Sequence, residues 1–191
     1  MRTAENATEE VRRFWFGNQP GERRKAWFVK DPVFDAEIRT RFLSLYESVA
    51  NRDLTDWNKS PAGSLALIVL CDQFPRNMFR GRADAFATGA RALSCAKAAV
   101  AADFDDEVPP LARVFFYLPF EHSERMLDQR YSLKLFGRLA AHPGMETFVD
   151  YAKRHYAVVE RFGRFPHRND MLGRPGTAEE LGFLKQPGSS F

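Results

Sequence analysis

Apolar residues recur at helical spacing along nearly the whole chain, and no segment alternates apolar and polar residues as a strand would. In the clearest stripe, five apolar residues recur at steps of three or four: Phe34, Ile38, Phe42, Leu45 and Val49. Such residues lie on one face of a helix. The preceding Asp31-Pro32 is a good helix start, because Asp caps a helix and Pro fits its first turn. The pattern predicts an all-α fold without a sheet.

A second helix start, Ser60-Pro61, precedes "AGSLALIVLCDQF", which is apolar on all sides. A helix without a polar face is packed by neighbours all round, so we expect it at the centre of the molecule. Thr88 and Ser123 open further helices, and Thr177 with Glu180 predicts a capping box for a last short one. We expect about seven to nine helices in a single domain over residues 1–191, since a single core typically runs to about 100–200 residues. Periodicity alone leaves a bundle and a helical-repeat array both open.

Composition indicates a packed core and a reducing compartment. The eighteen phenylalanines are interpreted as core residues. Cys71 and Cys95 lie in apolar helical surroundings without metal-site spacing, which predicts buried thiols. The N-terminal residues lack the apolar segment of a secretory signal, and "LALIVLC" is too short to span a bilayer. We therefore expect a cytoplasmic protein without membrane contact, and a final "PGSSF" segment anchored through Phe191.

The segment "DQFPRNMFRG" places a carboxylate directly after seven apolar residues. The helix dipole and burial both disfavour a charge on Asp72, so this residue needs a partner. Arg76 and Arg80 are the nearby candidates. Two interpretations stay open: a charge-paired cluster that holds a turn around Pro75, and a binding site in which the arginines face an anion and Asp72 orients them.

His122 stands between two glutamates in "LPFEHSE", where Pro119 either kinks or ends the preceding helix. If the helix continues, His122 lies on its core-facing side. If it ends, His122 precedes a new helix capped by Ser123. A histidine beside Glu121 and Glu124 suits acid–base chemistry, and it equally suits a structural histidine held by hydrogen bonds.

A second Arg/Asn-rich segment, "FGRFPHRNDMLGR", follows the helix that carries His155. His155 falls in an otherwise apolar stripe and is predicted to be a buried, hydrogen-bonded core histidine. Pro166 is expected to stop the helix. Four polar residues crowd its end: Arg164, His167, Arg168 and Asn169. Cations are favourable near a helix C-terminus, but loops of this composition also bind anions or fasten neighbouring elements, and both interpretations stay open.

Several kinds of site are missing from the sequence. It contains no glycine-rich phosphate loop, no GxSxG, no HExxH and no Cys/His metal spacing. We therefore expect no cofactor and no transition-metal site, while a divalent ion held by Asp72, Glu121 or Glu124 stays open. The net charge of the chain is +3, although residues 151–175 include six basic and only two acidic side chains. Without Lys/Arg runs this charge is too small for a large phosphate footprint, so no nucleic-acid partner is expected.

Seven segments, in order from about Phe14 to Phe191, resemble the bacterial family of unknown function DUF924: "FWFG", "WFVKDPVFDAEIRTRF", "LALIVLCDQFPRNMFRG", "AFAT", "FFYLPFEHSE", "RFGRFPHRNDMLGR" and "GFLKQPGSSF". The resemblance implies antiparallel helix pairs in a tetratricopeptide-like (TPR-like) array, with no defined activity. The positions that carry it are Asp72, Gln73, Arg76, Asn77, Arg80, His122, Ser123, Glu124, Arg164, His167, Arg168 and Asn169.

Three functions are compatible with these residues, in order of preference. The first is a binding protein in which the two Arg/Asn-rich segments and "EHSE" form one Arg/Asn/His/Asp pocket for a small anionic ligand or a peptide carboxylate. The second is an acid–base or hydrolytic enzyme that uses Asp72, His122 and Glu124 on an anionic substrate. The third is RNA binding through the basic residues of 151–175.

Overall fold

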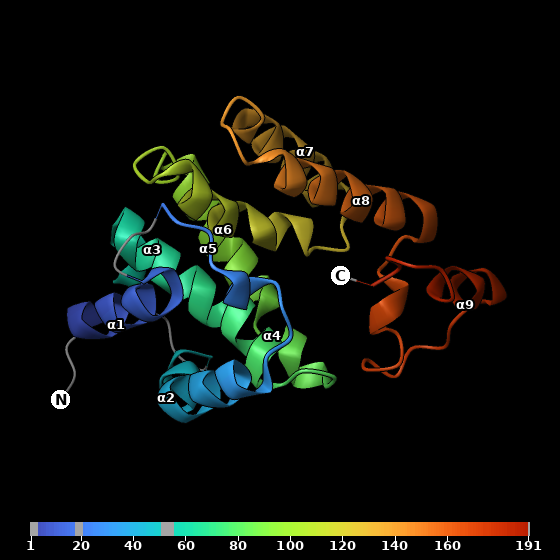
Figure 1. Ribbon diagram of the computed structural model, residues 1–191, viewed down its shortest axis with the longest axis horizontal. Helices are drawn as coiled ribbons and strands as arrows, with labels where there is room; N and C mark the ends of the chain where they lie inside the picture. Colours follow the sequence, from blue (N-terminus) through green and yellow to red (C-terminus); the bar gives the residue numbers. More distant parts are fainter. Residues whose placement is uncertain (1–3, 18–20, 51–55, 191) are drawn as a thin grey trace. The chain divides into compact units, whose positions relative to one another are not determined.

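The computed structural model describes residues 4–17, 21–50 and 56–190 (Figure 1). Within these ranges every regular element is helical and none is a strand, so the all-α prediction is confirmed. The α-helices are α1 (Ala4–Phe16), α2 (Pro32–Ala50), α3 (Pro61–Ile68), α4 (Phe74–Met78), α5 (Gly89–Ala101), α6 (Pro110–Glu121), α7 (Met126–Leu139), α8 (Glu146–Phe162) and α9 (Ala178–Leu184). None of the helices in the described ranges has the length and apolar character needed to cross a membrane.

Contacts divide the chain into two compact units. Unit 1 consists of Met1–Arg80 and Asp84–Pro119, and unit 2 consists of Gly81–Ala83 and Phe120–Phe191. Unit 1 therefore carries α1 to α5 and most of α6, whereas unit 2 carries α7 to α9. The single domain and the TPR-like array stay predictions.

Unit 1 packs α1 on α3, α2 on α4 and α3 on α5, around an aromatic core. The ring of Trp15 contacts those of Trp27, Phe74 and Phe115 at centroid distances between 5.6 and 6.1 Å. Phe42 lies 4.7 Å from Phe74. Each buried aromatic side chain removes about 150–250 Å² of surface from water. Phe42, Phe74 and Phe115 thus serve the core, as predicted, whereas Phe28 of the same unit is exposed.

Both predicted Pro-containing helix starts are confirmed. The Oδ1 atom of Asp31 accepts hydrogen bonds from the backbone N–H groups of Val33 and Phe34 at 2.9 and 3.2 Å. The Oγ atom of Ser60 accepts one from the N–H of Gly63 at 3.1 Å. Every residue from 63 to 75 is buried, as expected for a central helix.

The central helical run continues through Pro75, where the sequence predicts a turn. Pro75 has no N–H, so the carbonyl of Cys71 loses its helical partner. The hydroxyl of Thr88 donates to that carbonyl at 2.6 Å, which is why Thr88 makes no side-chain cap on α5. The N–H of Phe74 reaches back five residues to Val69, and the backbone widens into a π-turn. The helix therefore continues through Pro75, because Thr88 donates a hydrogen bond to the carbonyl of Cys71.

Helix α6 likewise runs through Pro119 and ends two residues later. His122 follows this end directly and is half-buried. Ser123 does not cap α7, which corrects the prediction. Its Oγ accepts from the N–H of Arg125 at 3.2 Å and donates to Asp128 at 2.8 Å, so it shapes the connection between α6 and α7.

In unit 2, α7 packs along α8 (Figure 1). In α7, Leu127 and Tyr131 are exposed, whereas Gln129 is buried. The amide of Gln129 donates to the carbonyls of Glu121 and Ser123, both at 2.6 Å. These carbonyls at the end of α6 need donors, and α7 turns its polar side toward them.

The C-terminal segment has the predicted capping box. Thr177 Oγ1 accepts from the N–H of Glu180 at 3.2 Å, and Glu180 Oε2 accepts from the N–H of Thr177 at 2.7 Å. Ser189 is buried and its hydroxyl donates to the carbonyl of Leu184 at 3.1 Å. The predicted anchor, Phe191, lies outside the described residues.

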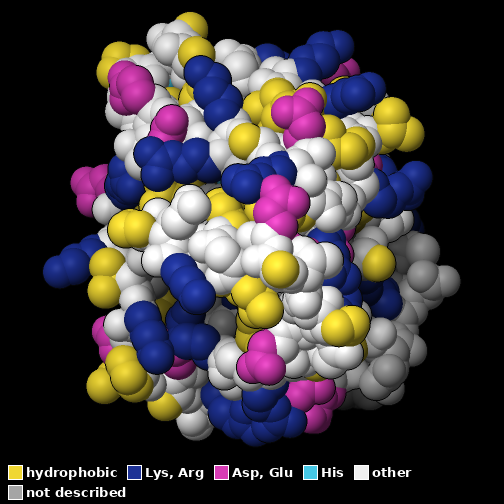
Figure 2. All heavy atoms as spheres, turned by 90° about the vertical axis from the view of Figure 1, so that its right-hand side faces the viewer, with side chains coloured by type: hydrophobic (Ala, Val, Ile, Leu, Met, Phe, Trp, Pro, Cys, Tyr) yellow, Lys and Arg dark blue, Asp and Glu magenta, His cyan; other side chains and the backbone are white. Residues whose placement is uncertain are grey.

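The basic segment 151–175 is largely neutralised by acidic side chains. Four of its cations form ion pairs: Arg154 with Asp150 at 2.7 Å, Arg161 with Glu179 at 2.8 Å, Arg164 with Glu180 at 2.6 Å and Arg174 with Glu124 at 2.7 Å. Figure 2 shows one face of the molecule, on which Lys and Arg are spread among acidic, hydrophobic and uncharged side chains. The local excess of positive charge in the sequence is thus mostly taken up by intramolecular pairs.

Candidate functional site

The buried carboxylate of Asp72 has the partner that the sequence predicts. Asp72 is 2% exposed and lies in the π-turn between α3 and α4. The amide of Gln73 donates to its Oδ2 at 2.5 Å, and the Nε of Arg76 lies 3.6 Å from its Oδ1. The guanidinium of Arg76 also lies over the ring of Phe86, 5.4 Å from its centroid. These contacts favour the charge-paired interpretation of Asp72.

Arg80, the other predicted partner of Asp72, pairs with Asp35 of α2. Its Nε and Nη2 donate to the two carboxylate oxygens of Asp35 at 2.8 and 2.9 Å, and Asn77 donates to Oδ1 at 2.7 Å. Burial acts to raise the pKa of Asp35, but the hydrogen bonds from Arg80 and Asn77 outweigh it and hold this pKa below its ordinary value. The pairing fastens the end of α4 to α2.

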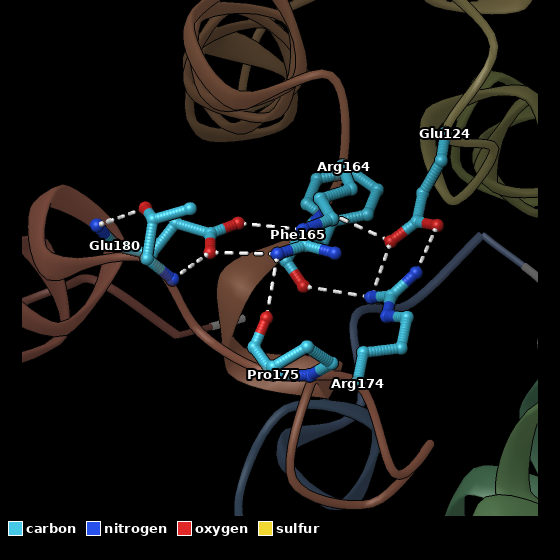
Figure 3. A network of polar contacts seen from close by, with 7 residues as sticks. Glu124, Arg164, Phe165, Arg174, Pro175 and Glu180 are labelled. Carbon is cyan, nitrogen blue, oxygen red and sulfur yellow. Dashed lines mark hydrogen bonds and ion pairs between the residues drawn. The ribbon is translucent and has the colours of Figure 1, made fainter.

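In unit 2, Arg164 fastens the loop after α8 to α9. The helix ends where Gly163 takes a left-handed conformation with φ of 69°. Arg164 then donates to both carboxylate oxygens of Glu180, at 2.6 and 2.8 Å, and to the carbonyl of Pro175 at 2.9 Å (Figure 3). Glu180 is 2% exposed. The hydrogen bonds from Arg164 lower the pKa of Glu180 to about 2, although burial acts in the opposite direction.

Glu124 holds the other side of the same loop. Arg174 donates to its two carboxylate oxygens at 2.7 and 3.0 Å, and the backbone N–H of Phe165 donates at 2.8 Å (Figure 3). Burial acts to raise the pKa of Glu124, but Arg174 and the N–H of Phe165 outweigh it and hold this pKa low. Glu124 is thus an ionised anchor for the loop between α8 and α9.

The ring of Phe165 is surrounded by imidazoles and a guanidinium. The ring centroids of His155 and His167 lie 5.4 and 5.7 Å from that of Phe165, and the guanidinium carbon of Arg168 lies 4.3 Å from it. Arg168 donates to the carbonyl of His122 at 2.9 Å, and the rings of His122 and His155 are 6.1 Å apart. We define the histidine cluster as these residues: Glu121, His122, His155, His167 and Arg168.

His155 is a buried, hydrogen-bonded histidine, as predicted, and it has a buried carboxylate beside it. Its side chain and that of Glu121 are each 4% exposed. The Nδ1 of His155 lies 2.9 Å from the carbonyl of Tyr151 and 3.2 Å from Oε1 of Glu121. Because both neighbours are oxygen acceptors, Nδ1 carries the proton in this arrangement.

The structure brings some predicted site residues together and separates others. His122, His167 and Arg168 share the histidine cluster. Arg164 hydrogen-bonds Glu180, and Asn169 is buried in the loop after α8. Asp72, Arg76, Asn77 and Arg80 make their contacts within unit 1. One pocket formed by segments 72–81 and 161–174 stays a prediction, because residues 72–80 and 161–174 belong to different units.

Sequence reasoning missed the carboxylates that hold these cations. Asp35 and Glu180 each bind an arginine of an Arg/Asn-rich segment from a different helix, so no local spacing reveals them. The sequence indicates Glu121 only as a neighbour of His122. A signal did exist, because Glu121 and His155 are both polar residues on the buried faces of apolar helices, and buried polar groups need partners.

Linkage gives a pH prediction for the pair of Glu180 and Arg164. The pKa of Glu180 is about 2 in the folded chain and ordinarily 4.5. The pair therefore contributes stability above pH 4.5, which is lost as pH falls toward 2. We expect the free energy of unfolding in urea to fall less steeply between pH 5 and 2 in Glu180→Gln than in the parent. Parallel pH profiles of the two proteins would contradict this assignment.

A surface hollow of unit 1 does not coincide with the predicted site. A surface hollow of about 580 Å³ lies between α1 and α2, and its lining includes Glu10, Glu37 and Arg41. Arg41 pairs there with Glu37 at 3.0 Å and with Glu10 at 3.7 Å. None of the predicted site residues lines this hollow.

Comparison with known proteins agrees with the resemblance noted in the sequence. A family model described as a bacterial protein of unknown function, DUF924, matches residues 11–188. A solved structure of a protein of unknown function from Agrobacterium tumefaciens is 38% identical, with a TM-score of 0.86 over 96% of this chain and 99% of that chain. No curated protein matches. The match over nearly the whole chain, together with this structural similarity, shows that the protein belongs to the DUF924 family of bacterial proteins of unknown function.

Proposed function

We propose that the protein binds a small anionic ligand at the histidine cluster of unit 2. The observation that carries this proposal is the convergence of Arg168 with three of the four histidines of the chain. Guanidinium and imidazole groups are donors that carry or can acquire positive charge, which suits phosphate and carboxylate recognition. The hydrogen bond from Arg168 to the carbonyl of His122 holds these two residues side by side.

Three other arginines are left out of this site because carboxylates already bind them. Arg164, Arg174 and Arg80 each donate two hydrogen bonds to one carboxylate within their own unit. A guanidinium in such a pair must give up that partner before it can bind a ligand, and this loss opposes binding. The proposed site is therefore narrower than the predicted pocket and keeps only its members in the histidine cluster.

A small molecule or a peptide carboxylate suits the cluster better than RNA does. An RNA-binding face needs many cations along a phosphate backbone, and four cations of segment 151–175 are held in ion pairs. One buried guanidinium with neighbouring imidazoles matches a single phosphate or carboxylate group. The ligand class proposed is thus a compact anion.

Removal of the Arg168 guanidinium is expected to abolish the response to anions. We expect inorganic phosphate, or a short peptide with a free carboxylate, to raise the melting temperature of the parent protein in a thermal-shift assay. Arg168→Gln should lose that rise, because the charged donor is gone. The matched control is Arg154→Gln, which removes a 58% exposed arginine of α8 and should keep the full response. A parent that shows no rise, or an equal rise in Arg168→Gln, would overturn the proposal.

A second candidate function, an acid–base enzyme, is favoured by the contact between Glu121 and His155. A carboxylate that orients an imidazole is the usual arrangement for a general base, and His122 lies beside this pair. Asp72 and Glu124, the carboxylates favoured from the sequence, are instead held by Arg76 and Arg174. Under this proposal, His122→Gln abolishes turnover and keeps ligand binding, whereas a pure binding protein shows no turnover to lose.

A further inference from the structure

The geometry points to a site for a divalent transition-metal ion formed by Glu121, His122 and His155. One ligand atom from each residue lies within 4.8 Å of the ligand atoms of the other two. Glu121 and His155 are buried, and His122 is half-buried. This inference goes beyond anion binding, since it assigns a cation to three residues of the histidine cluster.

The three side chains can converge on one ion after a small shift. Ligand atoms about 2.1 Å from a tetrahedral Zn²⁺ lie about 3.4 Å from one another. Oε1 of Glu121 and Nδ1 of His155 are already 3.2 Å apart. Ligand atoms that are up to 4.8 Å apart must move together by about 1 Å or slightly more to bind an ion of this size. His122 lies in the turn after α6, outside any helix, where such a shift needs the least free energy.

The chemistry of the three donors selects the class of metal. Two imidazoles and one carboxylate are the ligands of catalytic Zn²⁺ sites and of non-haem Fe²⁺ sites. Calcium and magnesium prefer oxygen ligands and are disfavoured by the two imidazoles. Three protein ligands also leave a coordination position for water or for an exogenous group. The expected ion is thus Zn²⁺, Fe²⁺ or Co²⁺.

The neighbours of the site are compatible with a bound cation. The proton on Nδ1 of His155 lies between the oxygens of Tyr151 and Glu121, and a metal ion would take its place. The carbonyl of Tyr151 keeps its helical backbone partner when that proton leaves. Arg168 opposes a cation electrostatically, because it donates to the carbonyl of His122. An anion at the remaining coordination position would offset this repulsion, which links the metal to the anion proposed above.

The sequence predicts no transition-metal site because the ligands come from two separate segments. Glu121 and His122 end α6 and follow it, whereas His155 lies in the middle of α8. Short metal-binding motifs place their ligands one or two helical turns apart, and that spacing is absent here. The site becomes visible only once α8 is placed beside the end of α6 in unit 2.

The test is a titration of ZnCl₂ into the full-length, chelator-treated protein in phosphate-free buffer, in which isothermal titration calorimetry measures the heat of binding. We expect one Zn²⁺ per chain. CoCl₂ should give the visible absorption bands of a tetrahedral site with nitrogen and oxygen ligands. His122→Ala removes a half-buried ligand outside the helices and should weaken Zn²⁺ binding by about tenfold or more. His142→Ala, which removes a half-buried histidine outside the cluster, should leave the affinity unchanged.

The outcomes separate this inference from the proposed function. A parent protein that binds no Zn²⁺, or a His122→Ala variant that binds it as tightly as the parent, would overturn the metal site. The phosphate thermal shift of the metal-free protein is measured on a separate sample. If phosphate stabilises the protein but Zn²⁺ does not bind, the anion site stands and the metal site is overturned. If Zn²⁺ binds but phosphate does not stabilise the protein, only the anion site is overturned.

Discussion

Glu180→Ala is expected to lower the free energy of unfolding by about 2–4 kcal/mol. Glu180 is 2% exposed and accepts two hydrogen bonds from Arg164 and one from the N–H of Thr177. Its loss removes these charge-assisted bonds and the capping box of α9 together. Urea denaturation followed by circular dichroism at pH 7 measures the effect.

The neighbouring residue provides a matched control. Glu179 also pairs with an arginine, Arg161 at 2.8 Å, but the two side chains are 61% and 51% exposed. Exposed ion pairs contribute little, so Glu179→Ala should change stability by less than about 1 kcal/mol. Equal effects of the two substitutions would show that burial of the pair between Arg164 and Glu180 is not what stabilises the loop.

Gly63→Ala is expected to destabilise the protein by about 1–3 kcal/mol or more. A methyl group at position 63 would lie 2.2 Å from the backbone carbonyl oxygen of Trp57 and 3.1 Å from the hydroxyl of Ser60. The nearest atom belongs to the backbone, so no side-chain rotation relieves the contact. The helix cap from Ser60 to Gly63 would have to shift with it.

Gly137→Ala is the control for this prediction. Gly137 is exposed in α7, and a methyl group there meets no atom within 4 Å. Alanine is the better helix former, so Gly137→Ala should stabilise the protein by about 0.5–1 kcal/mol. Thermal and urea unfolding of both variants check the opposite signs. A neutral or stabilising Gly63→Ala would mean that α3 does not approach Trp57 this closely.

The helices are predictable from the sequence because their signals are local. Asp31, Ser60 and Thr177 each cap a helix within three residues of themselves. The prediction at Pro75 fails for a non-local reason. Pro75 does not end its helix, because Thr88 satisfies the carbonyl that the proline leaves without a donor.

Three members of the histidine cluster, His122, His167 and Arg168, are among the residues that the sequence singles out, but the partners of the singled-out residues are not predictable. The sequence places Arg80 near Asp72 because they are two turns apart, but a carboxylate of α2 binds it with better geometry. The proximity of Glu121 to His155 depends on the placement of α8 beside the end of α6. Such pairings are set by tertiary packing, which a single sequence does not specify.

The two Arg/Asn-rich segments thus differ in what they contribute. In "DQFPRNMFRG" the contacts of Arg76, Asn77 and Arg80 hold carboxylates of unit 1. In "RFGRFPHRNDMLGR" two arginines fasten the loop, while His167 and Arg168 join the histidine cluster. We infer that the second segment carries function and that the first carries stability.

The most direct test of a ligand site at the histidine cluster is an NMR titration of the imidazole resonances with inorganic phosphate. The chain has four histidines, and His142 is the one outside the histidine cluster. It precedes α8 by four residues, whereas His155 lies well inside that helix. We predict saturable shifts for His122, His155 and His167, with His142 unchanged. Equal shifts of all four resonances, or none, would contradict a ligand site at the histidine cluster.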